Sequence, residues 1–582
     1  MWGNGREGAG MTGRVSIGHQ DFETIRTKGY FYIDKTRFIR EWWESGDSVT
    51  LLTRPRRFGK TLNLSMLEKF FSVEYAGRGD LFEGLSIWED EKYRELQGTY
   101  PVIFLSFASV KETNYDSARK RICQLIAEEY GKYVFLLEKG GLTETEKESF
   151  LRKTMDMSDI DATYALHQLS LYLSRYYGKK VIILLDEYDT PMQEAYVNGF
   201  WEEIVAYIRS MFNATFKTNP YLECAIMTGI TRVSKESIFS DLNNLKVVTA
   251  TSDKYADSFG FTEEEVFGAL EAQGMSEWKQ QVKEWYDGFT FGNKTDIYNP
   301  WSIINFLDEK RIGTYWANSS SNSLVGKLIR EGSREIKVTM EKLLKGETFR
   351  TSFDEQIVFS QLGQTEESVW SLLLASGYLK AVSYHYNIED RKAEYELRLT
   401  NLEVQAMFER MIDGWFGTCR GASNGFLRAM LEDDPEEMTE YMNEISCSVF
   451  SSFDTGKNSS GRTEPERFYH GFVLGLMVEL ADRYVITSNR ESGYGRYDVM
   501  LEPRERGKPP REKGAPAFIL EFKAVRTGKG ETLEEAVKTA LEQIEKRQYE
   551  AALIARGIPK ECIRKYGFAF CGREVLIGRG QA

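Results

Sequence analysis

Residues 49–61 read VTLLTRPRRFGKT and decide the fold of the first half of the chain. The run 49–53 is short and apolar, which is typical of a strand buried on both faces. After the loop 54–59, apolar residues fall on one face of a predicted helix: Leu62, Leu64, Met66, Leu67 and Phe70. Strand, loop and helix in this order predict a phosphate-binding loop, because a helix N-terminus presents free backbone N–H groups and the positive end of its dipole.

The residue types in this loop fit nucleotide binding. Gly59 lets the backbone approach a ligand closely, Lys60 can reach the terminal phosphates, and the Thr61 hydroxyl can ligate Mg²⁺. The preceding Arg57 and Phe58 complete the predicted nucleotide-binding loop. The usual pattern has a glycine where this chain has Arg54, so the bare pattern leaves an ordinary basic loop as the alternative.

A second motif lies at the end of another apolar run. Residues 181–185 lead directly into Asp186 and Glu187, the strand and acidic pair that NTPases use. Asp186 is placed to hold Mg²⁺, and Glu187 to accept a proton from the attacking water. Such a pair alone is usually a solvated strand end, but together with the upstream loop it predicts a nucleotide site.

A third apolar run, within 222–228, ends at Thr228 and is followed by Arg232. Thr228 is a candidate for orienting water, and Arg232 for stabilising developing phosphate charge. An ordinary surface arginine is an equal alternative for Arg232.

The chain divides into three predicted domains. From residue 15 to 310, apolar runs alternate with amphipathic stretches, which predicts an α/β domain with a parallel P-loop NTPase sheet. Residues 311–450 predict a helical middle domain, with a winged-helix-like arrangement left open. There, the apolar run 370–374 is followed by a stop at Gly377. The polar stretch 451–463 predicts a linker, and 464–582 form the C-terminal domain. Strands are expected at 49–53, 102–107, 181–185 and 222–228.

Acidic residues and a lysine stand on two predicted strands of the C-terminal domain, at 495–501 and 518–523. Glu521 and Lys523 are two residues apart and share a face, where Asp498 of the hairpin partner can join them. Two carboxylates beside a lysine suit Mg²⁺ or Mn²⁺, which would activate water and neutralise a scissile phosphate. The alternative is a salt-bridged strand pair on a solvated face.

Four flanking residues extend this predicted site. Upstream, Glu466 is a further candidate metal ligand and His470 a polar contact, although a lone histidine is more often structural. Downstream, residues 533–549 predict an amphipathic helix that carries Gln543 and Tyr549.

Composition limits the class of protein. The chain has 582 residues, of which 42% are hydrophobic, so it has ample material for folded cores. Its six scattered cysteines lack zinc-ligand spacing and argue against a disulfide framework. No signal-peptide or membrane-length apolar run is present, so a cytoplasmic location is expected; Met11 is an alternative start to Met1.

Charge is distributed unevenly along the chain. The net charge of −13 argues against a generally basic nucleic-acid-binding surface. Residues 456–582, however, carry 23 Lys and Arg against 18 Asp and Glu, a balance of +5, while the remainder carries −18. The positive balance accompanies the predicted metal site, as expected of a phosphate-binding domain.

Motifs across nearly the whole chain resemble those of a bacterial family that joins an AAA-ATPase-like N-terminal domain to a C-terminal PD-(D/E)XK nuclease-superfamily domain. Arg54 resembles this family's own variant of the phosphate loop. The resemblance implies ATP and Mg²⁺ binding at the first site and metal-dependent phosphodiester cleavage at the second. The matching stretches are 17–22, 32–36, 54–61, 186–189, 285–289, 298–301 and 377–379, with Asp498, Glu521 and Lys523.

The sequence therefore predicts an ATP-binding, ATP-hydrolysing protein whose nucleotide state controls a metal-dependent nuclease acting on DNA or RNA. The alternatives are a nucleotide-controlled switch that binds nucleic acid or protein without cutting, and a plain NTPase with an adaptor tail. A homo-oligomer is left open, and no membrane partner is expected.

Overall fold

The computed structural model forms two compact units, Met1–Phe408 and Glu409–Ala582, which are described separately. The structure describes residues 13–580 except 140, 232–237, 240–241, 318, 320–324, 327, 330–332, 353–364, 388–391, 418–419, 450–472, 474–476, 478–479, 481–482, 489–490, 493–494, 497, 505–514, 526–530 and 572–573.

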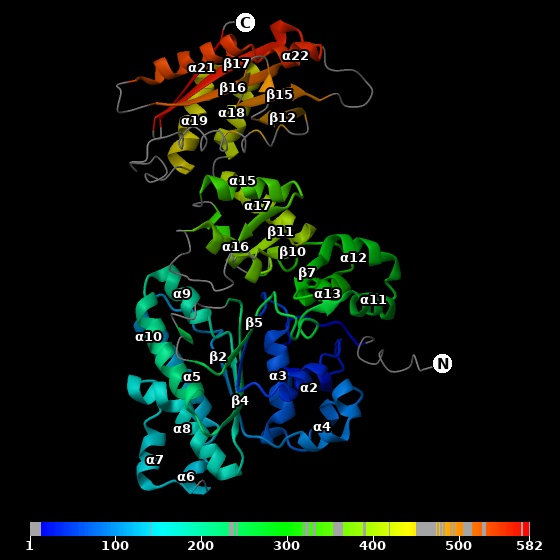
Figure 1. The fold of residues 1–582 in the computed structure, drawn as a ribbon, viewed down its shortest axis with the longest axis vertical. Helices are drawn as coiled ribbons and strands as arrows, with labels where there is room; N and C mark the ends of the chain where they lie inside the picture. The colour runs from blue at the N-terminus through cyan, green and yellow to red at the C-terminus, as the bar shows by residue number, and fades with distance from the viewer. Residues whose placement is uncertain are drawn as a thin grey trace. The chain divides into compact units, whose positions relative to one another are not determined.

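A parallel sheet of five strands forms the centre of the first unit (Figure 1). Its order is β2-β3-β4-β1-β5, with β1 Val49–Thr53, β2 Val102–Ser106, β3 Val181–Asp186, β4 Leu222–Gly229 and β5 Leu245–Val248. The four strands expected from the sequence are all present. Every residue of β1 and β3 is buried, which explains why their sequences are continuous apolar runs.

Helices cover both faces of this sheet (Figure 1). Helix α8 begins at the Ser158 cap and ends at Gly178, whose φ is +68°. The described elements of this part are α1 Phe22–Thr27, α2 Arg37–Glu44, α3 Lys60–Phe71, η1 Val73–Tyr75, η2 Gly79–Leu81, η3 Ser86–Glu89, α4 Glu91–Leu96, α5 Tyr115–Gly131, α6 Leu136–Lys139, α7 Glu144–Leu151, α8 Asp159–Tyr177, α9 Thr190–Asn198, α10 Trp201–Phe212 and η4 Asn213–Lys217.

The rest of the first unit contains two small antiparallel sheets, ordered β6-β8-β7 and β10-β11-β9. Gly377 has φ +83° and follows α16, as the sequence predicted. The elements are β6 Phe261–Thr262, α11 Glu263–Ala272, η6 Ser276–Trp278, α12 Lys279–Tyr286, β7 Asp287–Phe291, β8 Lys294–Tyr298, α13 Pro300–Glu309, α15 Arg334–Leu344, β9 Phe349–Ser352, α16 Glu366–Ala375, β10 Leu379–Asn387 and β11 Lys392–Leu399. Helix α17, Leu402–Gly417, begins in the first unit and ends in the second.

The second unit is a mixed sheet between helices (Figure 1). Its strand order is β12-β15-β16-β17-β18; β16 and β17 are parallel, and the other neighbouring pairs are antiparallel. The predicted hairpin is confirmed, because Val499 of β15 pairs with Leu520 of β16. The elements are α18 Arg420–Glu432, α19 Pro435–Val449, β12 Tyr484–Ser488, β13 Glu491–Ser492, β14 Gly495–Arg496, β15 Val499–Pro503, β16 Ala517–Ala524, α21 Leu533–Arg547, α22 Ala551–Ala555, η10 Lys560–Cys562, β17 Ile563–Cys571 and β18 Glu574–Arg579.

Two helices from the region expected to be a middle domain pack in this second unit. Phe426 and Met430 of α18 and Met438 of α19 share one buried core with Leu501 and Leu520 of the sheet. The compact units thus divide residues 311–450 between them. Among the described residues, none of the helices has the length and apolar character that crossing a bilayer requires.

Candidate functional sites

The phosphate loop joins β1 to α3 as the sequence predicted. Gly59 is the residue before α3 and has φ +81°, a conformation that glycine adopts without strain. The backbone N–H of Asn63 donates to the carbonyl of Gly59 at 2.9 Å, so the helix begins at the loop. The first N–H groups of α3 are therefore presented where a phosphate would bind.

Lys60 is buried and held by its own loop. Its Nζ donates to the carbonyl oxygens of Arg54 at 3.0 Å and Pro55 at 2.8 Å. Burial lowers the pKa of Lys60, while the charges of Glu187 and Asp186 oppose this shift. The ammonium group thus lies inside the loop and faces the acidic residues at the end of β3.

Asp186, at the end of β3, accepts hydrogen bonds from residues of α3 and β4. Thr61 of α3 donates to Asp186 Oδ2 at 2.7 Å, and Thr228 of β4 donates to Oδ1 at 2.6 Å. Burial raises the pKa of Asp186, and the two hydroxyl groups act against that rise. The predicted residues Thr61, Asp186 and Thr228 therefore lie together beside Lys60.

Glu187 follows in an unusual backbone conformation. Its φ is +50°, which is rare for a residue with a side chain. Thr190 Oγ1 donates to Glu187 Oε2 at 3.2 Å. Arg232, predicted beside this group, lies outside the described residues.

Arg54 has a structural role that the sequence did not reveal. Its side chain is fully buried, donates to the carbonyls of Thr249 at 2.7 Å and Tyr255 at 3.3 Å, and lies 4.5 Å from the Phe291 ring centre. Burial lowers its pKa to about 9. Arg54 thus ties the phosphate loop to the segment after β5, at the position where the usual pattern has glycine.

Aromatic residues of the 285–289 and 298–301 motifs and their neighbours pack against side chains of the phosphate loop. Phe58 is buried against Phe289 and Phe291, with ring centres 4.7 and 5.4 Å away. Its ring therefore packs within the protein. The Arg57 guanidinium lies 4.2 Å from the Trp301 ring centre.

Two further side chains hold the loop backbone. Asn299 Nδ2 and Trp316 Nε1 donate to the carbonyl of Arg56 at 3.4 and 3.0 Å. A side chain at Gly377 would place its Cβ 2.8 Å from Pro55. The 285–289, 298–301 and 377–379 motifs therefore support the shape of the phosphate loop.

The stretches 32–36 and 285–289, which also carry the family resemblance, make structural contacts. Asp34 accepts hydrogen bonds from the backbone and hydroxyl of Thr36 at 2.8 and 2.6 Å and from Ser86 N at 2.7 Å. Lys35 pairs with Glu265 at 2.7 Å. Tyr286 is buried and donates to the carbonyl of Gly313 at 2.9 Å.

The second predicted site lies on the hairpin of the second unit. Asp498 precedes β15, and its Oδ2 accepts from the N–H of Phe522 at 2.9 Å. Glu521 and Lys523 stand on β16, with Lys523 Nζ 3.3 Å from Glu521 Oε1. Gln543 of α21 donates to the same Glu521 oxygen and to Tyr549 OH, the latter at 3.1 Å. The structure thus brings all five residues together.

The donors at this site fit a divalent cation. Glu521 is 1% exposed, and its Oε2 has no hydrogen-bond partner within the described part of the chain. Burial, together with the charge of Asp498, raises the pKa of Glu521 to about 8. A cation between the two carboxylates would relieve their repulsion and occupy the unpaired oxygen. The predicted Glu466 and His470 lie outside the described residues.

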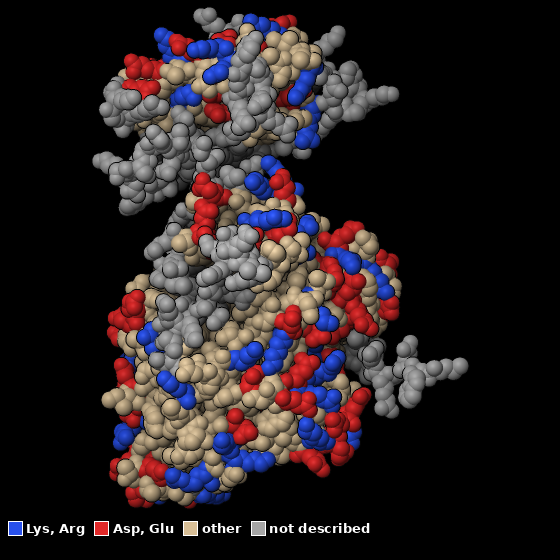
Figure 2. Space-filling view, in the orientation of Figure 1, with Lys and Arg blue, Asp and Glu red and all other residues tan. Residues whose placement is uncertain are grey.

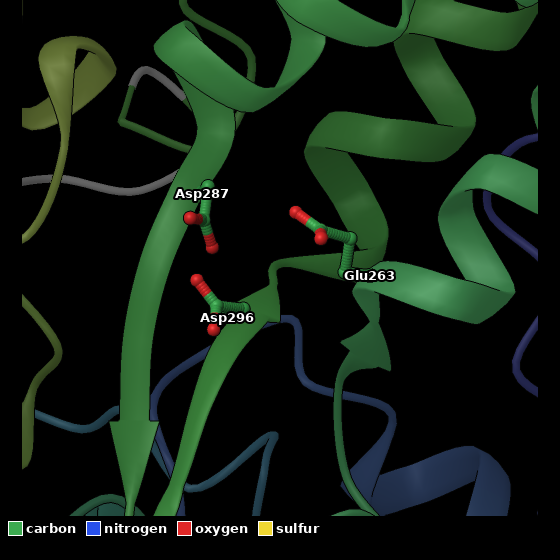
Figure 3. Close-up of side chains that lie close together, drawn as sticks. All are labelled: Glu263, Asp287 and Asp296. Atoms are coloured by element: carbon green, nitrogen blue, oxygen red, sulfur yellow. The ribbon is translucent and has the colours of Figure 1, made fainter.

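A separate acidic cluster is formed by Glu263, Asp287 and Asp296, whose carboxylate oxygens lie within 4.8 Å of one another (Figure 3). Lys283 forms an ion pair with Glu263. Burial and the neighbouring Asp296 raise the pKa of Asp287 to about 7. The ion pair with Lys283 and the raised pKa of Asp287 both reduce charge repulsion in this cluster, which joins α11 to the β7–β8 hairpin.

Comparison with known proteins finds a family match in each of two separate stretches of the chain. Residues 16–239 match the family described as predicted AAA-ATPase, and residues 464–580 match the PD-(D/E)XK nuclease superfamily. A protein of Azotobacter chroococcum mcd 1, described as "Uncharacterized protein in vnfD 5'region", is 25% identical over 398 residues, which cover 68% of each chain. The chain therefore combines an AAA-ATPase-like domain with a PD-(D/E)XK nuclease-superfamily domain, each matched by its own family model.

Proposed function

We propose that the protein binds and hydrolyses ATP at the first site and cleaves DNA or RNA at the second, with nucleotide state controlling cleavage. The observation that carries the ATPase assignment is the meeting of Thr61 and Thr228 on Asp186, beside Lys60. These groups come from the phosphate loop and from two neighbouring strand ends, as a phosphoryl-transfer site requires.

At the first site, the residues divide the work of binding and positioning. The N–H groups at the start of α3 and the Lys60 ammonium would bind the phosphates. To do so, Lys60 would give up its hydrogen bonds to the carbonyls of Arg54 and Pro55 and donate to phosphate oxygens instead. Thr61 and Asp186 would hold Mg²⁺, which neutralises phosphate charge when bound. Glu187 is assigned to accept the proton of the attacking water, and Thr228 to orient it.

At the second site, Asp498 and Glu521 would hold Mg²⁺ or Mn²⁺, with Glu466 as a further candidate ligand. The metal supplies an activated water and charge neutralisation when bound. Gln543 fixes the orientation of Glu521, and Lys523 places a positive charge beside it. Lys523 is thereby suited to position the nucleophile or the scissile phosphate.

Surface charge supports assigning nucleic acid to the second unit. On the visible face, acidic side chains gather over the α11–α13 part of the first unit, while both signs are interspersed over the second unit (Figure 2). The net charge of +5 in residues 456–582, against −18 in the rest of the chain, likewise makes the second unit the less acidic part. A polyanionic substrate is repelled less from this part of the chain than from the rest.

The test incubates the full chain with plasmid, single-stranded DNA and RNA in Mg²⁺ or Mn²⁺, with EDTA as the control. Each reaction is repeated with and without ATP at matched free metal. Metal-dependent cleavage that changes with ATP supports the proposal. Identical cleavage with and without ATP would show that nucleotide state does not regulate the nuclease. Binding of nucleic acid without cleavage would favour the alternative of a non-cleaving switch.

A further inference from the structure

The loop after β3 engages every polar backbone and side-chain group of Thr231, which follows β4. Asp189 Oδ2 accepts from the N–H of Thr231 at 2.9 Å and from its hydroxyl at 2.8 Å. Tyr188 OH donates to the carbonyl of Thr231 at 2.7 Å. The N–H of Ile230 donates to the same Asp189 oxygen at 3.1 Å. Two consecutive residues, Tyr188 and Asp189, therefore fix the position of the chain at Thr231.

This junction is buried and closely packed. Tyr188, Asp189 and Thr231 are each at most 1% exposed. A Cβ at Gly229 would lie 2.6 Å from Asp189 Oδ1 and 2.7 Å from the Tyr188 ring, so glycine is needed there. Displacement of the loop relative to the end of β4 would break several buried hydrogen bonds at once.

The same contacts enclose Glu187. On one side, Thr61 and Thr228 bind Asp186; on the other, the N–H of Tyr188 donates to the carbonyl of Thr228 at 3.0 Å. A residue with a side chain keeps a left-handed conformation only where its surroundings determine it on both sides. The strained conformation of Glu187 is therefore maintained by its neighbours.

Gln193 of α9 extends the network to the phosphate loop. Its Nε2 donates to Asp189 Oδ2 at 2.9 Å, and its Oε1 accepts from Arg56 Nη2 at 3.4 Å. Arg56 is exposed on the phosphate loop, whereas Asp189 is buried behind it. The contacts thus run from the surface of the loop, through Gln193, to the buried junction at Thr231.

We propose that Tyr188 and Asp189 are positioning residues for ATP hydrolysis, which hold Glu187 and Thr228 in the geometry that the hydrolytic step needs. The inference rests on the proposed ATPase function. Because both residues are buried behind Asp186 and Glu187, they act on turnover and leave nucleotide affinity nearly unchanged. A loss of transition-state geometry alone lowers kcat with little change in KM.

The test compares Asp189→Asn with Asp34→Asn in the full chain. Asp34 is a matched control, because it also accepts hydrogen bonds from backbone N–H groups and from the hydroxyl of a threonine, Thr36. Circular dichroism and thermal melting establish folding, calorimetry measures binding of a non-hydrolysable ATP analogue, and phosphate release gives kcat and KM. Tyr188→Phe, which keeps the ring and removes the hydroxyl, serves as a milder second variant.

The expected result for Asp189→Asn is a kcat at least about tenfold lower, with KM and analogue affinity within about threefold of wild type. Asp34→Asn keeps the wild-type kcat, and Tyr188→Phe lowers it by a smaller factor. If Asp189→Asn does not fold, the kcat of Tyr188→Phe tests the positioning role in its place. An unchanged kcat in the folded variants, or an equal loss in Asp34→Asn, overturns the positioning role alone. A wild-type chain that does not hydrolyse ATP overturns the proposed ATPase function and this inference with it.

Discussion

Replacing Thr228 by valine tests the centre of the first site. Valine keeps the shape of the side chain but removes the hydroxyl that donates to Asp186 Oδ1 at 2.6 Å. Thr228 is fully buried and Asp186 is 1% exposed, so water has little access to the lost position. A hydrogen bond to a charged group contributes about 1.5–3 kcal/mol, and we expect Thr228→Val to destabilise the first unit by about that amount.

Thr215 offers a matched control within the same unit. It is also fully buried, but its Oγ1 has no hydrogen-bond partner in the described part of the structure. Thr215→Val therefore replaces an unpaired hydroxyl by a methyl group and is expected to be neutral or stabilising by about 1 kcal/mol. The two substitutions are chemically identical and differ only in the contact that they remove.

The assay is thermal unfolding of both variants and wild type in the same buffer, followed by tryptophan fluorescence. A change of 1 kcal/mol shifts the melting temperature of a domain of about 200 residues by about 2–4 °C, so Thr228→Val should melt several degrees lower. Phosphate release is measured in parallel, and Thr228→Val should turn over more slowly. Equal melting temperatures for wild type and Thr228→Val, or an equal fall in Thr215→Val, would refute the reasoning.

Three further predictions concern the other groups. Lys60→Ala should weaken ATP binding at least about tenfold in a calorimetric titration, because it removes the cation that faces the phosphates; unchanged affinity would contradict the assignment. Glu521→Ala should abolish metal-dependent cleavage while ATP binding stays intact, and cleavage that persists in the purified variant would show that the site is wrong. Asp287→Asn should raise the melting temperature more at pH 8 than at pH 5. The pKa of Asp287 is raised from 3.8 to about 7 in the folded state, so between these pH values the folded state binds more protons than the unfolded state. Wild-type stability therefore falls as pH rises through this window, and asparagine removes that loss. An equal difference in melting temperature between Asp287→Asn and wild type at pH 5 and pH 8 would refute the prediction.

Local sequence signals predicted the elements that carry both sites. The apolar runs predicted as strands form β1 to β4, and β1 and β3 are buried at every residue. A continuous apolar run indicates a strand covered on both faces, and this signal is present in the local sequence. Gly59 and Lys60 mark the start of α3, and the two-residue spacing of Glu521 and Lys523 places them on one face of β16. The hairpin that brings Asp498 to them is likewise short-range.

The middle of the chain was predicted less completely. Residues 392–399 alternate polar and apolar side chains, with Ala393, Tyr395, Leu397 and Leu399 on one face, and form β11. This period of two indicates a strand, although the region was interpreted as mainly helical. The packing of α18 and α19 against the second sheet depends on long-range contacts, such as the hydrogen bond from Asn443 of α19 to Val575 of β18, 132 residues away, which no local pattern contains.

By itself, the sequence determined the order of strand, loop and helix, the acidic strand ends, and the residue types of two phosphate-directed sites. These features depend on neighbouring residues and on the periodicity of burial. Only the tertiary structure decided which contacts Arg54 makes in place of a glycine, how the 298–301 motif supports the loop, and how Asp189 holds Thr231. Each of these contacts joins segments 40 or more residues apart, and their partners are backbone carbonyl and N–H groups, which every residue possesses and which therefore leave no signature in the sequence.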